Sequence, residues 1–189
     1  MARKKNSPVP APSQSVYGAD PVKQQAAYHT LSILVNNEPG VLARVVGLFS
    51  GRGYNIESLT VAETDTVNNL SRITVICSGT PMVIEQIKNL LSKLVPVHRV
   101  TDLTLFGPHV ERELALIKVV GAGDKRIEAL RTADIFRAKV VDSTLESFVF
   151  EVTGTSEKID AFINLMRPLG LADVNRTGAA AISRGTHID

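Results

Sequence analysis

The chain has 189 residues, which is enough for one medium domain or two small ones. Hydrophobic residues make up 44% and charged residues 21%, as in an ordinary globular protein. The formal net charge of +2 is too small to indicate nucleic-acid binding, and no apolar run reaches the roughly 20 residues of a membrane span. The sole cysteine, Cys77, excludes an intrachain disulfide and fits a reducing compartment, so we expect a cytoplasmic protein.

Residues 1–27 differ in composition from the rest of the chain. They are rich in Pro, Ser, Ala and Gln and hold few large apolar side chains. Such a segment cannot bury enough surface to offset the entropy lost on ordering, so we predict a disordered tail. No apolar core follows the basic start at Arg3, Lys4 and Lys5, so the pattern is not that of a secretory signal. A transit peptide stays open, although Asp20 and the prolines make it less attractive.

Residues 28–106 show the pattern of a βαββαβ block. Apolar side chains alternate over 31–35, which indicates one face of a strand. A helix predicted over 40–52 carries an apolar stripe. A second helix, running to about residue 94, is predicted to begin at Thr80-Pro81, where a good N-cap residue precedes a proline. The strands are expected at residues 31–35, 55–61, 70–77 and 97–105.

Residues 107–189 repeat this order of elements, although they do not repeat the sequence. Gly107-Pro108 marks the boundary between the blocks. We therefore predict an α+β fold of two ferredoxin-like βαββαβ domains, with antiparallel sheets and helices on one face. Because such a sheet leaves its other face and its edges bare, we expect subunit pairing. The expected strands are 114–120, 139–142, 147–152 and 172–182, and the expected helices are 124–136 and 156–169.

The junction of the first strand and first helix is the candidate binding site. The N–H groups of Gly40, Val41 and Leu42 are expected to point out of the helix start, where the helix dipole favours a carboxylate. Gly40 allows a ligand to approach closely, because it has no Cβ. The Asn37 side chain offers both a donor and an acceptor to an amino acid. Pro39 has no N–H to offer.

A second pair of residues opens the next strand. Asn55 and Ile56 could face this helix start from a partner chain in an antiparallel dimer. The alternative is that 37–40 is an ordinary turn and Asn55 an ordinary turn exit. No nucleophile lies beside a base in this pattern, so we predict an amino-acid sensor rather than a catalytic site.

Other features of the sequence are less informative. Cys77 shares its alternation with Ile73 and Val75, and no His lies near it in sequence, so we interpret it as a core residue. Residues 121–124 lack the third glycine and the Gly-Lys-Ser/Thr ending of phosphate loops, so a turn capped by Asp124 is expected. The strands at 55–61 and 70–77 carry none of the aromatic side chains of RNA-binding sheets. No metal-ligand spacing links the four histidines, His29, His98, His109 and His187.

Several stretches resemble a known family, the regulatory (small) subunit of acetohydroxyacid synthase, also called acetolactate synthase. The resemblance covers about residues 28–185, in order and without large gaps. Within it, the first block resembles the ACT domain, a ligand-sensing module of amino-acid metabolism. The stretches are LSILVNNEPGVLARVVGLFSGRGYNIESLTV, LSRITV, IEQIKNLLSKLVPVHRV, ERELALIKV, IFRAKVVD, GTSEKIDAF and AISRG.

The resemblance implies a regulatory subunit with no catalytic residue, metal or cofactor of its own. It implies a homodimer formed through the ACT domains, with valine or another branched-chain amino acid bound at the interface. It also implies a catalytic large subunit holding thiamine diphosphate, Mg²⁺ and FAD, which this chain activates and makes sensitive to valine. The family's effector positions fall on Asn37, Pro39, Gly40, Val41 and Leu42, with Asn55 and Ile56 from the partner.

Two questions stay open at this point. The resemblance assigns no clear role to the second block. An alternative function is a stand-alone ACT-type sensor that binds valine but regulates another enzyme or transcription.

Overall fold

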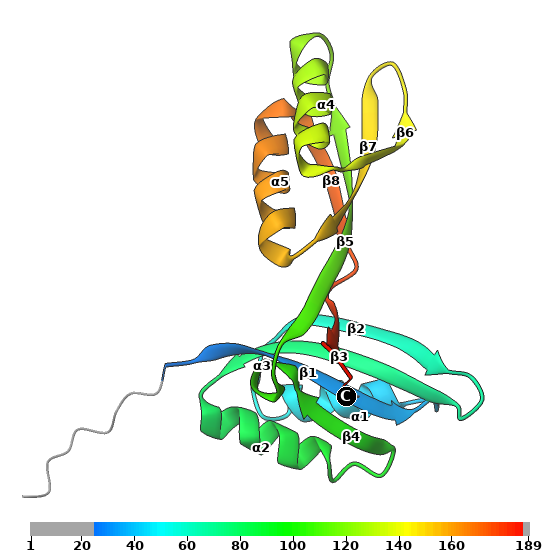
Figure 1. Ribbon diagram of the computed structural model, residues 1–189, viewed down its shortest axis with the longest axis vertical. Helices are drawn as coiled ribbons and strands as arrows, with labels where there is room; N and C mark the ends of the chain where they lie inside the picture. The colour runs from blue at the N-terminus through cyan, green and yellow to red at the C-terminus, as the bar shows by residue number, and fades with distance from the viewer. Residues whose placement is uncertain (1–24, 187–189) are drawn as a thin grey trace, which may run out of the picture.

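The computed structural model describes residues 25–186, which form two α+β units placed one above the other along the long axis (Figure 1). The predicted disorder of the tail falls almost wholly on residues 1–24, outside the described part. Ala27 already belongs to the first strand, so the tail prediction was too long at that end. Within residues 25–186, no helix combines the length and the apolar character needed to cross a bilayer.

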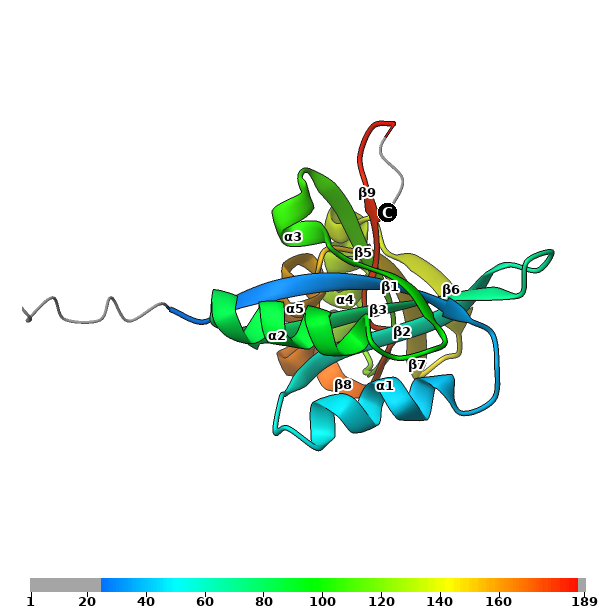
Figure 2. The ribbon, with the colours of Figure 1, turned by 90° about the horizontal axis from the view of Figure 1, so that it is seen from below.

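The first unit is a four-stranded antiparallel sheet in the order β2-β3-β1-β4. Helices α1 and α2 cover the face that is turned away from the second unit, and they lie in front of the strands when seen from below (Figures 1 and 2). The elements are β1 (Ala27–Asn36), α1 (Val41–Ser50), β2 (Ile56–Asp65), β3 (Leu70–Gly79), α2 (Pro81–Leu91), β4 (Val97–Asp102) and α3 (Leu103–Phe106).

The core of the first unit lies between this sheet and its two helices. Leu31 and Ile33 of β1 stand opposite Val75 and Ile73 of β3, and all four are fully or almost fully buried. The apolar side chains that alternate along the sequence of these strands therefore lie on the helix-facing side of the sheet. Cys77 is buried in the same cluster, as predicted.

The strand predicted over residues 97–105 is too long. It ends at Asp102, whose carboxylate accepts hydrogen bonds from the N–H groups of Thr104 (3.1 Å) and Leu105 (3.4 Å). These bonds cap the short helix α3 and turn the chain toward the second unit.

The second unit has the sheet order β6-β7-β5-β8, again with two helices on one face. Aromatic side chains fill its core, where the rings of Phe150 and Phe162 meet edge to face with centroids 6.1 Å apart. The predicted fold class of two antiparallel βαββαβ units is confirmed. The elements are β5 (His109–Val120), α4 (Asp124–Phe136), β6 (Lys139–Ser143), β7 (Ser147–Gly154), α5 (Ser156–Gly170), β8 (Leu171–Arg176) and β9 (Ala180–Ser183).

The prediction of a single last strand over residues 172–182 is wrong, because the chain forms two strands there. β8 pairs with residues 115–119 of β5, in the second unit, whereas β9 pairs with residues 109–112 of the same strand. β5 is longer than the second sheet, and its first residues need a partner of their own. The long β5 therefore links the two units, with β9 beside its lower end (Figure 1).

The chain itself covers part of the open face of the first sheet. β9 contacts β1, and Ala179 and Ala181 are buried. Thr30, Ser32 and Thr74, on the face opposite the helices, are also buried. Subunit pairing is therefore not needed to cover this part of the face. The two edge strands of the first sheet are not covered in this way, because among residues 25–186 β2 pairs with β3 alone and β4 with β1 alone.

Candidate functional site

The candidate site lies where β1 turns into α1. Gly40 is the N-cap of α1, with φ 85° and ψ −5°, a left-handed conformation that residues other than glycine adopt rarely. No side chain caps this helix. The prediction of three free amides is wrong for Val41, whose N–H donates to the Glu38 carbonyl at 3.3 Å because the turn is tight. What stays available is the helix start around Gly40 and Leu42, both exposed.

The turn between β2 and β3 holds the site loop in place. The Asn37 N–H donates to the Asn69 carbonyl at 2.8 Å, and the Asn69 side-chain amide donates to the Asn37 carbonyl at 3.2 Å. Asn37 thus fixes the loop through its backbone and leaves an exposed side chain for a ligand. Asn69 itself has φ 54°, a conformation that Asn tolerates better than most residues.

A second set of side chains at this loop was missed by the sequence reasoning. The Asn36 amide donates to the Glu38 carboxylate at 2.8 Å, and its oxygen accepts from Nε2 of His98 on β4. His98 is 62 residues away in the chain, so no local pattern could have predicted this contact. The Asn-Asn pair that ends the first strand was the available signal, but only its second member was singled out.

Asn55 and Ile56 lie at the opposite end of α1 from Gly40. The helix has 10 residues, which corresponds to about 15 Å. The Asn55 amide donates to the Glu57 carboxylate at 2.5 Å. Within one chain, therefore, the fold does not bring this pair to the β1–α1 loop.

A cysteine, a histidine and an aspartate do meet in the core of the first unit. His29 stands directly across the strands from Cys77, and its Nδ1 lies 2.8 Å from Oδ2 of Asp102. Burial, and secondarily the charge of Asp102, raises the pKa of Cys77 to about 11. The thiol is therefore neutral near pH 7, so this buried group is not an activated nucleophile. The position of His29 opposite Cys77 could not be predicted from the sequence, because their strands, β1 and β3, are far apart along the chain.

Other predicted features can now be placed. Residues 25–186 contain no cluster of three or more His, Cys, Asp or Glu side chains arranged to hold a metal ion. Asp124 is the first residue of α4 rather than its cap, because Gly123 takes the N-cap position. His187 lies outside the described residues.

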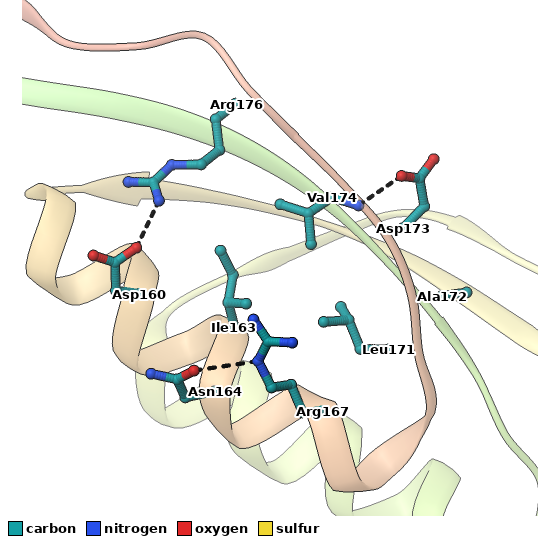
Figure 3. A pocket seen from close by; sticks show the side chains of 9 residues that line it. All are labelled: Asp160, Ile163, Asn164, Arg167, Leu171, Ala172, Asp173, Val174 and Arg176. Atoms are coloured by element: carbon teal, nitrogen blue, oxygen red, sulfur yellow. Dashed lines mark hydrogen bonds and ion pairs between the residues drawn. The ribbon is translucent and has the colours of Figure 1, made fainter. Parts of the chain in front are cut away.

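An open cleft of about 700 Å³ lies in the second unit, between α5 and β8, away from the β1–α1 loop (Figure 3).

Comparison with known proteins is consistent with this geometry. One family model, "Small subunit of acetolactate synthase", matches residues 112–185, and another, "AHAS small subunit-like ACT domain", matches residues 31–99. The chain is 48% identical over 157 residues to the probable acetolactate synthase small subunit of Archaeoglobus fulgidus, covering 83% of this chain and 97% of that protein. It is 47% identical to the acetolactate synthase isozyme 3 small subunit of Escherichia coli, covering 84% and 96%.

The fold is also similar to a solved structure. The small subunit of acetolactate synthase from Thermotoga maritima superposes with a TM-score of 0.78 and 41% sequence identity. The match covers 85% of this chain and 99% of that one, so it includes both units and their arrangement.

Proposed function

Because the chain belongs to the acetolactate synthase small-subunit family, we propose that it activates the catalytic subunit of that enzyme and makes it sensitive to valine. In this proposal valine, or a related branched-chain amino acid, binds between the ACT domains of two chains. The observation that carries the proposal is the start of α1, where exposed Gly40 precedes amides that no side chain caps. Such a helix start attracts a carboxylate.

The topology of the first unit supports an interface site. β1 and β2 both run antiparallel to β3, so they are parallel to each other, and α1 returns between them. The start of α1 is therefore near the C-terminal end of β2. If two chains join their β2 edges in antiparallel fashion, the first residues of the partner's β2 approach that helix start. Asn55 and Ile56 stand at that end of the strand.

The β2 edge has the properties of an interface. Between two register shifts, residues 58–63 pair regularly with β3, which leaves a straight stretch for a second strand. Val61 on this edge is 42% exposed, and Leu42 in the first turn of α1 is 40% exposed. Unpaired edges with apolar side chains tend to recruit another strand. A partner that covers this edge would complete the sheet and bury these side chains.

The polarity of the candidate residues suits a branched-chain amino acid. The ligand carboxylate would accept from the N–H groups of Gly40 and Leu42, since Pro39 has no N–H and that of Val41 already donates to Glu38. The Asn37 side chain would bind the ammonium group through its oxygen. The apolar side chains of Leu42 and, from the partner, Ile56 would contact the branched side chain.

The chemistry of the enzyme belongs, in this proposal, to the large subunit. Thiamine diphosphate, Mg²⁺ and FAD would bind there, in the cytoplasm, and this chain would act only on the equilibrium between conformations. Valine can inhibit only if it binds one arrangement of the assembly better than another. A ligand that joins two chains across their interface makes such a differential contact.

A charge at Gly40 tests the site. In enzyme reconstituted from both subunits, Gly40→Asp should abolish inhibition by valine, because its carboxylate would repel that of the ligand. Activation of the large subunit should persist. Gly40→Asn has a similar size without the charge and should retain more inhibition. Gly47→Asp places the same charge in open space on α1 and should leave inhibition unchanged.

The outcomes separate the possible errors. Full inhibition of the Gly40→Asp enzyme would show that valine binds elsewhere. If the wild-type chain bound valine but neither activated nor inhibited any acetolactate synthase large subunit, the stand-alone sensor would be the better function.

A further inference from the structure

Between β8 and β9, the chain passes along β2 of the first sheet. β8 ends at Arg176 in the second unit, and β9 begins at Ala180, where it pairs with the start of β5 and contacts β1 of the first sheet. Residues 177–179, which we call the clasp, connect the two and lie against β2. The other connection between the units runs through α3 into β5.

The clasp is tightly attached to β2. The Ala179 N–H donates to Oγ of Ser58 at 2.9 Å, and Oγ1 of Thr60 donates to the Thr177 carbonyl at 3.3 Å. Between them, Gly178 has φ 79°. A Cβ on Gly178 would lie 2.8 Å from Ser58 Oγ, 3.0 Å from Thr60 Oγ1 and 3.2 Å from the Leu59 carbonyl oxygen. Only glycine therefore fits both the space and the backbone conformation.

On the β2 side, the clasp is close to the proposed effector residues. Ser58 follows Ile56 by two positions, and the register of β2 against β3 shifts between them. The residue between them, Glu57, accepts a hydrogen bond from the Asn55 side chain. A bulge of this kind is a place where a strand bends. A change in the position of Asn55 and Ile56 therefore has a short route to Ser58.

On the other side, the clasp is fixed to the second unit. The Thr177 N–H donates to the Leu114 carbonyl at 3.0 Å, and the Leu114 N–H donates to Oγ1 of Thr177 at 3.2 Å. Arg176 forms an ion pair with the buried Glu113 on β5. Its guanidinium also binds Asp160 of α5 at 2.6 Å, at the rim of the cleft (Figure 3). The clasp is therefore bonded to β5 directly and, through the neighbouring Arg176, to α5.

We propose that the clasp transmits occupancy of the effector site to the second unit. This inference rests on the proposed function and deepens it, because it gives the second unit a part in the response to valine. Valine binding at Asn55 and Ile56 shifts β2 at its bulge, and Ser58 and Thr60 pass that shift to residues 177–179. The connection through α3 and β5 joins the two units independently of the clasp. Breaking the contacts between the clasp and β2 therefore uncouples the second unit from the effector site and leaves the units joined.

Two glycine variants test the clasp. Gly178→Ala and Gly185→Ala both place a Cβ at a positive φ, 79° and 80°, but only the first meets β2, since nothing lies within 4 Å at Gly185. L-valine binding to the full chain is measured by calorimetry, and amide hydrogen exchange over residues 171–183 is measured with and without L-valine. Ser58→Ala removes the acceptor of the Ala179 N–H without adding bulk, so it serves as a second uncoupling variant that keeps Gly178 intact.

The expected result separates binding from transmission. Wild type and Gly185→Ala should bind L-valine and change their exchange over residues 171–183. Gly178→Ala and Ser58→Ala should still bind L-valine, with an affinity altered by no more than the coupling that they remove, but should lose most of that change in exchange. Coupled sites typically alter each other's equilibrium about fivefold or more, so the loss is measurable.

Two results would overturn the inference. If L-valine changed exchange in Ser58→Ala and Gly178→Ala as it does in wild type, the signal would not pass through the clasp, although the binding site would stand. If the wild-type chain did not bind L-valine at all, the proposed function would fail, and the clasp would have no signal to transmit.

Discussion

The two units place a helix at the same point of the same topology, but the two helix starts differ in charge. α1 and α4 each follow the first strand of their unit, and each has a glycine at the N-cap and no capping side chain. The first turn of α4 contains Asp124, whereas the first turn of α1 contains no acidic residue. A carboxylate at a helix start satisfies the dipole from within the chain. The start of α1 therefore lacks the internal carboxylate that α4 has, as the proposed valine site requires.

The cores of the two units also differ in the side chains that they bury. The first unit buries a His29, Asp102 and Cys77 group beside its apolar core, whereas the second unit buries Glu113 and Thr132 and packs three phenylalanines in its core. Replacing one core aromatic residue in each unit should show which unit L-valine binding depends on.

The largest expected effect comes from Phe162→Ala in the second unit. Phe162 is fully buried, and its loss should cost about 3–5 kcal/mol of the free energy of unfolding. L-valine binding should survive, because the proposed site lies in the first unit. Phe49→Ala, at an equally buried position under α1, should lower stability by a similar amount and abolish binding. Denaturant unfolding and calorimetric titration of both variants check this. Loss of binding in Phe162→Ala alone would contradict the separation.

A smaller effect is expected at alkaline pH, and only in the first unit. The pKa of Cys77 is raised from the ordinary 9.0 to about 11. Between these values the unfolded chain releases a proton that the native state keeps, so stability falls as pH rises, by up to about 1.4 kcal/mol per pH unit. The contribution is complete below pH 9. Comparing denaturant midpoints of wild type and Cys77→Ala from pH 8 to 10.5 isolates it from other groups. Equal slopes for the two proteins would refute the burial argument.

The smallest effect sharpens the comparison of the helix starts. Ala43→Glu gives the exposed first turn of α1 a carboxylate, as in α4. It should raise stability by about 0.3–1 kcal/mol through the helix dipole and, at the same time, weaken L-valine binding. Ala43→Gln, without the charge, should do neither to the same extent. Thermal unfolding and calorimetry on the three proteins give both quantities. A Glu variant that bound L-valine as tightly as wild type would indicate that the carboxylate is held elsewhere.

The parts of the fold that follow from local pattern could be predicted from the sequence. Alternation in β1 and β3 and the Thr80-Pro81 helix start are properties of neighbouring residues, and the fold contains them as expected. The division of residues 171–183 into two strands, β8 and β9, was not predictable. It depends on the length of β5 and on a crossing at Gly178 that matters only because β2 lies beside it.

The candidate site divides in the same way. Gly40 was found because a glycine before an apolar helical stripe is a local signal, and its left-handed conformation agrees with that reading. The contacts of Asn36 with His98 and of His29 with Asp102 join residues 62 and 73 positions apart. Such pairs are set by strand order and register, which the spacing of residues along the chain does not reveal. Whether Asn55 and Ile56 complete the site depends on a second chain.

The most direct test of the central claim is complementation between two defective chains. Gly40→Asp damages the helix start, and Asn55→Asp damages the opposite contribution to the same site. L-valine binding is measured by calorimetry for each variant alone and for an equal mixture that has been unfolded and refolded together. Our account predicts no binding by either variant alone. It predicts that the mixture regains about a quarter of the wild-type capacity, because half of the dimers are mixed and each holds one intact site. A mixture that forms mixed dimers but binds no L-valine, or an Asn55→Asp chain that binds it like wild type, would contradict a site shared between two chains.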